Sequence, residues 1–152
     1  MGSAVRRTYR GVRVTSLDRQ FTHLQLAAPP RLCADAFHLP FSPRSFDVVL
    51  CPLLMREYVH EDAARLVSSL PGVCRRALII LDLYRHALAY YFLPASRVLF
   101  GWSEITLHDG PVSVEASYRP DELVRLAQDA GLLHLHVRHH VPWFRVSLVA
   151  KR

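Results

Sequence analysis

The stretch ADAFHLPFSPRSFDVVLCP, residues 34–52, decides how the rest of the chain is interpreted. Its second half, residues 46–51, is a short apolar run rich in β-branched residues and closed by Pro52, which is typical of a strand buried on both faces. Its first half follows another short strand, residues 31–34, which ends at Asp35. The residues between the two strands are too few for a helix of useful length, so we expect a loop there.

Outward from this stretch, strands alternate with helices, which predicts an α/β sheet with both faces covered. We expect the last two strands to form an antiparallel hairpin, because only Pro142 separates them. The expected elements are strands over residues 11–17, 31–34, 46–51, 76–83, 132–141 and 143–150, helices over 19–26, 60–70, 86–100 and 120–130, and a loop over 108–117.

The helix over residues 120–130 has the clearest pattern. Pro120 lies in its first turn, acidic residues follow where the helix dipole favours anions, and Gly131 closes it. The apolar residues recur at helical spacing and predict a stripe buried against the sheet, made of Leu123, Leu126, Ala127 and Ala130.

Composition predicts a folded domain in the cytoplasm. Hydrophobic residues make up 51% of the 152 residues, so a real core is expected. No apolar run is long enough to span a membrane, and no signal-peptide pattern follows Met1. The three cysteines lack metal spacing and are interpreted as reduced thiols. We expect residues 1–10 to be a disordered leader and residues 11–152 to form one domain.

The net charge of +6 raises the question of a nucleic-acid partner. The basic residues are scattered, apart from a cluster at Arg6, Arg7, Arg10 and Arg13, and scattered arginine is usually a solvated face. We therefore expect no nucleic-acid surface. Four histidines near the carboxyl end have no acidic or cysteine partner at ligand spacing, so no metal site is expected either.

The pattern D-A-x-x-L-P-F followed by S-F-D-V-V, in residues 35–49, resembles the middle of a class I S-adenosylmethionine-dependent methyltransferase of the small-molecule type 11 group. The resemblance covers about residues 12–151. It implies a Rossmann-like sheet, mostly parallel, with an antiparallel hairpin at its carboxyl end. It also implies that the chain takes S-adenosylmethionine as its methyl donor.

The resemblance assigns cofactor contacts to two strand ends. Asp18 matches the acidic residue that holds the ribose hydroxyls, and a carboxylate can accept two hydrogen bonds from a vicinal diol. An exposed aspartate in a turn is the alternative for Asp18. Asp35 matches the residue that meets the adenine amino group, and Ala36 supplies backbone beside the ring.

The resemblance also implies that the residues after the next strand lie beside the methionine part of the cofactor. Ligands of such sheets bind beyond the carboxyl ends of the strands. These residues are Cys51, Pro52 and Leu53. Arg56 and Glu57 stand where family members often have two histidines, which removes one candidate base. His86 remains a candidate general base, with a helix-start histidine as the alternative.

One family motif is absent from these residues. The family's first strand ends in a glycine-rich loop, roughly D-x-G-x-G, whereas the six glycines of this chain lie far apart. In the family's strand order, 3-2-1-4-5-7-6, the first strand lies between the second and the fourth. We therefore expect the first strand and helix to be missing, with a gap at the centre of the sheet.

Two functions follow from these observations. The first is methyl transfer from S-adenosylmethionine to a small-molecule acceptor, with weak binding of the donor because the glycine-rich loop is absent. The alternative is a non-catalytic methyltransferase-like fragment, or remnant, that acts through a partner chain supplying the missing strand.

Overall fold

The computed structural model describes residues 2–101, 103–141 and 143–151. The chain forms two compact units, Met1–Phe41 and Ser42–Arg152, and each is described by itself. Residues 11–152, which we expected to form one domain, are divided between the two units.

The first unit is a small α/β structure built on two short parallel strands. It consists of α1 (Gly2–Thr8), β1 (Ser16–Asp18), α2 (Phe21–Gln25) and β2 (Arg31–Cys33). Ser16 pairs with Arg31 and Asp18 with Cys33. The expected strand over residues 11–17 is shortened to β1. Pro29 and Pro30, which precede β2, have no N–H to donate to a longer ladder.

The expected disordered leader contains α1 in this structure. The Arg6 guanidinium donates hydrogen bonds to the backbone oxygens of Val14 and Ala28, which ties the helix to the rest of the first unit. Seven residues are too few for a helix to be stable alone, so these tertiary contacts account for α1. Such contacts cannot be read from local sequence.

The second unit is built on a four-stranded sheet with the order β3-β4-β6-β5. The strands are β3 (Phe46–Pro52), β4 (Cys74–Leu83), β5 (Leu135–His140) and β6 (Arg145–Lys151). β3 runs parallel to β4, whereas β6 is antiparallel to both β4 and β5. The expected antiparallel hairpin at the carboxyl end is therefore confirmed.

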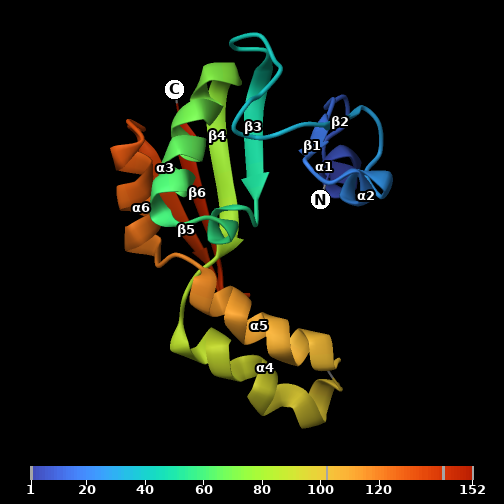
Figure 1. Cartoon of the computed structure of the whole chain (residues 1–152), viewed down its shortest axis with the longest axis vertical. Coiled ribbons are helices and arrows are strands. Elements are labelled where there is room, and N and C mark those ends of the chain that lie inside the picture. Colours follow the sequence, from blue (N-terminus) through green and yellow to red (C-terminus); the bar gives the residue numbers. More distant parts are fainter. Residues whose placement is uncertain (1, 102, 142, 152) are drawn as a thin grey trace. The chain divides into compact units, whose positions relative to one another are not determined.

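Two helices, α3 (His60–Ser69) and α6 (Pro120–Asp129), lie together on one side of this sheet (Figure 1). Two short 3-10 helices, η1 (Met55–Glu57) and η2 (Leu70–Val73), connect α3 to the strands before and after it. Leu66 of α3 and Leu126 of α6 are fully buried, as are Ile80 and Leu148 of the strands. The apolar stripe predicted for α6 is confirmed, with Leu123 and Ala127 also buried and Ala130 half-buried at the helix end.

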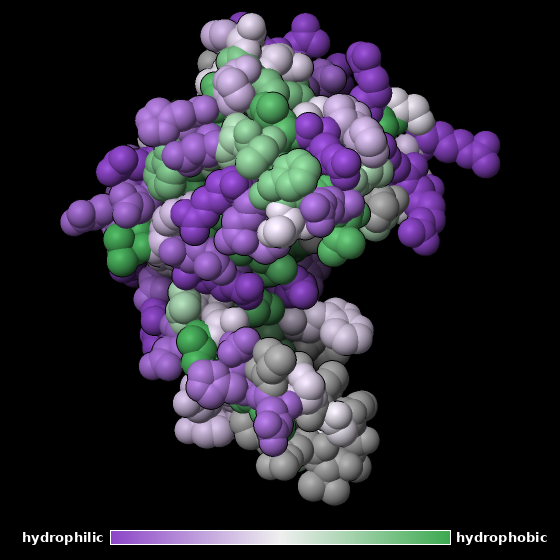
Figure 2. Space-filling view, turned by 45° about the vertical axis from the view of Figure 1, so that its right-hand side comes forward, coloured by the Kyte–Doolittle hydropathy of each residue, from purple (hydrophilic) through white to green (hydrophobic). Residues whose placement is uncertain are grey.

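The next two helices, α4 (Ala87–Phe100) and α5 (Glu104–Ala116), pack against each other and extend beyond the carboxyl ends of β3 and β4 (Figure 1). Figure 2 shows hydrophobic residues beside hydrophilic ones on this hairpin, where Leu88 and Tyr91 are exposed. No described helix has the length and apolar character needed to cross a bilayer.

The expectation of a loop over residues 108–117 was wrong, because residues 108–116 belong to α5. Gly110 and Pro111 are typical of a turn, and the segment has no apolar stripe to indicate a helix. Packing against α4 stabilises the helix, which the local sequence does not predict. A buried Val114 and a hydrogen bond from Ser117 Oγ to the Ser113 oxygen at 2.6 Å fix the end of the helix.

The six strands form two separate sheets, β1-β2 and β3-β4-β6-β5. In the family order this division falls where the first strand would lie, between β1 and β3. The described residues before β1 form α1 and an irregular segment, with no strand among them. The described residues thus have the expected Rossmann-like α/β topology with a C-terminal antiparallel hairpin and without the first strand, and one helix, α1, precedes β1.

We predict that Leu126→Asp lowers the free energy of unfolding by about 3 kcal/mol, because it buries an unpaired charge. Thermal unfolding followed by circular dichroism measures the change. Arg125→Ala is the matched control, since this neighbouring side chain is 71% exposed. An unchanged melting temperature in Leu126→Asp would rule out the packing of α6 described above.

Candidate functional site

Asp18 lies at the carboxyl end of β1, and both of its carboxylate oxygens have partners. Oδ1 accepts the N–H of Gln20 at 2.8 Å, and Oδ2 lies 3.1 Å from His23 Nδ1. Burial raises the pKa of Asp18, but the Gln20 N–H and His23 outweigh it, so the pKa lies below its usual value. Asp18 is therefore held as a carboxylate at neutral pH.

Asp35 follows β2 and repeats this construction. Its Oδ1 accepts the N–H of Phe37 at 3.0 Å, and its Oδ2 lies 3.3 Å from His38 Nδ1. The Phe37 N–H, followed by His38, lowers the pKa of Asp35. Ala36, between the two bonded residues, is half-buried.

The two carboxylates follow adjacent parallel strands at one edge of the first sheet, as predicted. Asp18 pairs with Cys33, and the backbone oxygen of Asp18 accepts the N–H of Ala34 at 3.1 Å. Each carboxylate oxygen has two lone pairs, so a diol or an amino group can bind without displacing the present partners. The turn at Asp18 was also the non-functional alternative, and both interpretations are compatible with this geometry.

In the second unit, β3 ends at the residues expected to face the methionine side. The side chain of Cys51 is buried, so only its backbone can meet a ligand, whereas Pro52 is exposed. Burial, and then the nearby Asp82 charge, raise the pKa of Cys51 to about 12. Leu53 has a φ of 55°, a conformation that is rare for leucine, and its N–H donates to the Leu81 oxygen at 2.7 Å.

Asp82, near the end of β4, holds the turn that follows β3. This buried carboxylate accepts the N–H of Met55 at 3.0 Å through Oδ2 and the N–H of Leu83 at 2.8 Å through Oδ1. Burial raises the pKa of Asp82, although the bonds from these N–H groups and the charge of Arg56 act in the opposite direction. Asp82 therefore positions the β3–η1 turn, and its side chain is not presented to solvent.

His86 precedes α4, and its Nδ1 accepts the N–H of Leu88 at 3.1 Å. Its ring stacks on Phe144 with a centroid distance of 5.9 Å and meets the edge of Tyr84. This is the geometry of a histidine that caps the start of a helix. The ring is nevertheless exposed, and its role as a general base remains a prediction.

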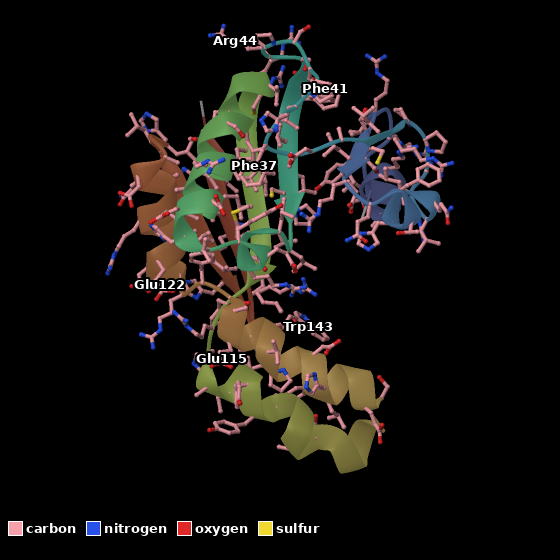
Figure 3. All side chains as sticks on the ribbon, in the orientation of Figure 1. Phe37, Phe41, Arg44, Glu115, Glu122 and Trp143 are labelled. Atoms are coloured by element: carbon pink, nitrogen blue, oxygen red, sulfur yellow. The ribbon has the colours of Figure 1, made fainter. Side chains whose placement is uncertain are left out.

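A cavity of about 360 Å³ lies near the carboxyl end of β4, where the segments before α3 and α6 come together. Arg85 and Glu122 form part of its wall and are joined by two hydrogen bonds of 2.7 Å. Glu122 at the start of α6 and Glu115 near the end of α5 lie on the same side of this unit (Figure 3). Tyr118, which also lines the cavity, donates through its hydroxyl to the Tyr58 oxygen at 3.2 Å.

Among the described residues, no three His, Cys, Asp or Glu side chains come together in a group that could hold a metal ion.

The fold and the paired carboxylates define a Rossmann-like α/β protein with polar groups at the carboxyl ends of parallel strands. The sequence profile of methyltransferase domains matches residues 2–79, and the chain belongs to this family. A comparison with curated protein sequences gives no match.

Solved structures share the fold at low sequence identity. Human N-acetylserotonin methyltransferase, in complex with S-adenosylmethionine, matches 99% of this chain and 43% of its own length, with 13% identity and a TM-score of 0.69. A Nostoc punctiforme protein provisionally assigned as an O-methyltransferase matches 99% of this chain and 47% of its own, with 16% identity and a TM-score of 0.66. The chain thus spans less than half the length of these two proteins.

A third structure, the [4+2]-cyclase SpnF, matches 99% of this chain and 70% of its own length, with 13% identity and a TM-score of 0.66. Proteins described by different reactions therefore share this fold, so the reaction has to be argued from the site.

Sequence reasoning did not find the histidines that accompany the two carboxylates. His23 lies five residues after Asp18 and His38 three residues after Asp35. The signal that could have indicated them is the repeated occurrence of a histidine shortly after a strand-end aspartate. No sequence pattern indicates the role of Asp82, because the N–H of Met55, which it accepts, belongs to a distant segment.

We predict that His23→Ala raises the pKa of Asp18, because His23 supplies both a hydrogen bond and a favourable charge. His38→Ala is the matched control and should raise the pKa of Asp35 alone. Carbon-13 NMR titration of the two side-chain carboxyl groups measures both values.

The lowered pKa of Asp18 also makes the stability of the fold depend on pH. A carboxyl whose folded pKa lies below its unfolded value stabilises the fold above the unfolded pKa, and this contribution disappears as the pH falls through the folded pKa. His23→Ala should therefore make stability less dependent on pH in the acidic range. An unchanged Asp18 pKa in His23→Ala would contradict the pairing.

Proposed function

We propose that this chain uses S-adenosylmethionine as a methyl donor for a small-molecule acceptor. Membership of the methyltransferase domain family supports the class of reaction. The observation that carries the proposal is the matched pair of carboxylates, Asp18 and Asp35, which follow the adjacent parallel strands β1 and β2. Shared fold alone would not support it, given the cyclase among the similar structures.

In this proposal the carboxylates hold the adenosine half of the donor. Asp18 accepts hydrogen bonds from the two ribose hydroxyls, while Asp35 accepts one from the adenine amino group and Ala36 lies beside the ring. Both pKa values are lowered, so both groups are charged acceptors at neutral pH. Hydrogen bonds to charged groups are worth about 1.5–3 kcal/mol each.

The second unit has the remaining roles in the proposal. We assign the methionine part of the donor to the turn at Pro52 and Leu53, with Cys51 contributing only backbone. An acceptor nucleophile approaches the sulfonium methyl in line, the bond from the nucleophile to carbon forms, and the carbon–sulfur bond breaks to leave S-adenosylhomocysteine. Catalysis in this scheme is mainly positioning. His86 is the candidate base for deprotonating the acceptor.

The cavity beside Arg85 is the proposed place for part of the acceptor. It lies near the carboxyl end of β4, where ligands of open α/β sheets usually bind. Tyr58, His60 and Tyr118 supply aromatic walls, and the Arg85–Glu122 pair leaves little net charge between them. The other charged side chain of the lining, Arg125, pairs with Asp121 at 3.2 Å. A small, largely uncharged acceptor fits this lining best.

The donor is expected to bind weakly to this chain. The 152 residues contain no glycine-rich loop to hold the carboxypropyl end of S-adenosylmethionine. Without two or so charge-assisted hydrogen bonds, affinity falls by about a hundredfold or more, since each 1.4 kcal/mol is tenfold. This absence is also what favours the alternative, a non-catalytic fragment that acts through a partner chain supplying the missing strand.

We expect isothermal titration calorimetry with S-adenosylmethionine to give a dissociation constant in the high micromolar range or weaker for this chain. Asp18→Asn, which keeps an oxygen for the Gln20 N–H but removes the charge, should weaken binding by about tenfold. Asp121→Asn is the control, because this aspartate lies on α6 and is 61% exposed.

Two results would count against this proposal, and a third would count against the expected weak binding alone. Absence of binding at millimolar donor would contradict the cofactor assignment and favour the non-catalytic alternative. Equal affinity in Asp18→Asn and the wild type would contradict the role of Asp18. A low-micromolar constant would show that the glycine-rich loop is dispensable, and the chain would then bind its donor as a complete enzyme does.

A further inference from the structure

The hairpin formed by α4 and α5 is joined to the rest of the second unit at one place. The chain leaves β4 through residues 84–86 to enter α4, and it returns from α5 through residues 117–119 to enter α6. The N–H of Arg85 donates to the Tyr118 oxygen at 3.2 Å, so these two irregular segments lie side by side. We call residues 84–86 and 117–119 together the neck.

The side chain of Arg85 connects the two segments of the neck. Its Nη2 donates to both carboxylate oxygens of Glu122, at 2.7 Å each, and its Nη1 donates to the backbone oxygen of Glu115 at 3.5 Å. Glu122 also accepts the N–H of Arg119, a neck residue, at 2.8 Å. One guanidinium thus links the segment after β4 to the end of α5 and to the start of α6. We call the Arg85–Glu122 pair the latch.

The two helices of the hairpin pack mainly against each other (Figure 1). Outside the neck, Phe92 of α4 lies near Phe144, with 6.4 Å between the ring centroids, and α5 contacts η1. Segments fastened by few tertiary contacts move at a lower free-energy cost than a core, and a few residues at the ends of elements absorb hinge motions. The neck has the form of such a hinge.

The cavity of about 360 Å³ described above lies beside the neck. The residues of the neck and of the start of α3 that line it are Arg85, Ser117, Tyr118, Tyr58 and His60. The cavity therefore lies between the neck and α3, and a rotation at the neck would change its opening. All of these residues belong to the second unit.

We propose that the α4–α5 hairpin is a lid over this cavity, that it rotates about the neck, and that the Arg85–Glu122 latch holds it in the position described. The latch has the bidentate geometry of a strong ion pair. Its side chains are nevertheless 41% and 32% exposed, so water competes for both charges and the latch can open. An open lid would admit a ligand and a closed one would exclude water. The cavity is where the proposed acceptor binds, but the hinge does not depend on methyl transfer.

The test measures one distance in the full 152-residue chain by double electron–electron resonance. Spin labels are attached after Val112→Cys on α5 and Arg65→Cys on α3, because both side chains are exposed. Cys33→Ser removes the exposed native thiol, whereas Cys51 and Cys74 are buried. Circular dichroism shows whether each variant is folded.

We expect one narrow distance distribution for the labelled chain. Arg85→Gln should raise the population outside this peak by about fivefold, which corresponds to the upper range of partly exposed ion pairs. Glu122→Gln, which keeps an oxygen for the Arg119 N–H, should do the same. Arg125→Gln is the matched control and should leave the distribution unchanged, because the Arg125–Asp121 pair lies on α6 outside the neck.

Hydrogen exchange shows whether the moving hairpin is a lid. Because α5 contacts η1, opening should expose the backbone amides of Glu57 and Tyr58 at the end of η1. Tyr58 also lines the cavity, so its exchange reports on the opening of the cavity. Both amides should exchange faster in Arg85→Gln than in Arg125→Gln.

The proposal is overturned if either folded latch variant, Arg85→Gln or Glu122→Gln, keeps the narrow distance. It is overturned equally if the distribution is broad while the latch is intact, or if Arg125→Gln broadens it as much. A broadened distance with unchanged exchange of Glu57 and Tyr58 would show a moving hairpin that is not a lid. No S-adenosylmethionine is added in these measurements, so the lid and the proposed methyl transfer can fail independently.

Discussion

The pairing of β4 on both of its edges is the constraint on which the second unit depends. β4 is parallel to β3 along one edge and antiparallel to β6 along the other, so its side chains fix the register of the whole sheet. Register also decides which residues enter the core, because a shift by one residue exchanges the two faces. At its end, Asp82 bonds the N–H of Met55 and so sets the turn that leaves β3. The core, the covered face and the candidate methionine-side turn all follow from this strand.

The same register gives the sheet unequal faces. The face with Ile80 and Leu148 is closed by α3 and α6, whereas the face with Leu50 and Ile79 is only partly covered by described residues.

Much of the second unit could be predicted from the sequence, because its signals are local. The apolar runs of β3 and β4, the helical spacing of Leu123 and Leu126, and the segment around Pro142 each indicate an element without tertiary information. The helix α5 could not be predicted, because Gly110 and Pro111 indicate a turn and only packing against α4 accounts for the helix. Asp82 could be placed at a strand end, but not in the core, because its partners are backbone groups far along the chain.

The candidate site in the first unit was predicted in part. Asp18 and Asp35 could be placed at adjacent strand ends because each follows a short apolar run. Their histidine partners were not found, because a hydrogen bond between a turn residue and a nearby side chain depends on the turn conformation. The two carboxylates have the same surroundings, an N–H two residues on and a histidine, and this shared construction is the basis for assigning both to one ligand.

That assignment is tested most directly by following backbone amides in nitrogen-15 NMR while S-adenosylmethionine is added to the chain. The N–H groups of Gln20 and Phe37 donate to Asp18 and Asp35, so they report on new partners of the two carboxylates. If both carboxylates hold the adenosine half, these two signals should shift together along one binding curve, and those of α6 should stay unchanged. Shifts confined to residues after Phe41, with Gln20 and Phe37 unmoved at saturation, would contradict the assignment.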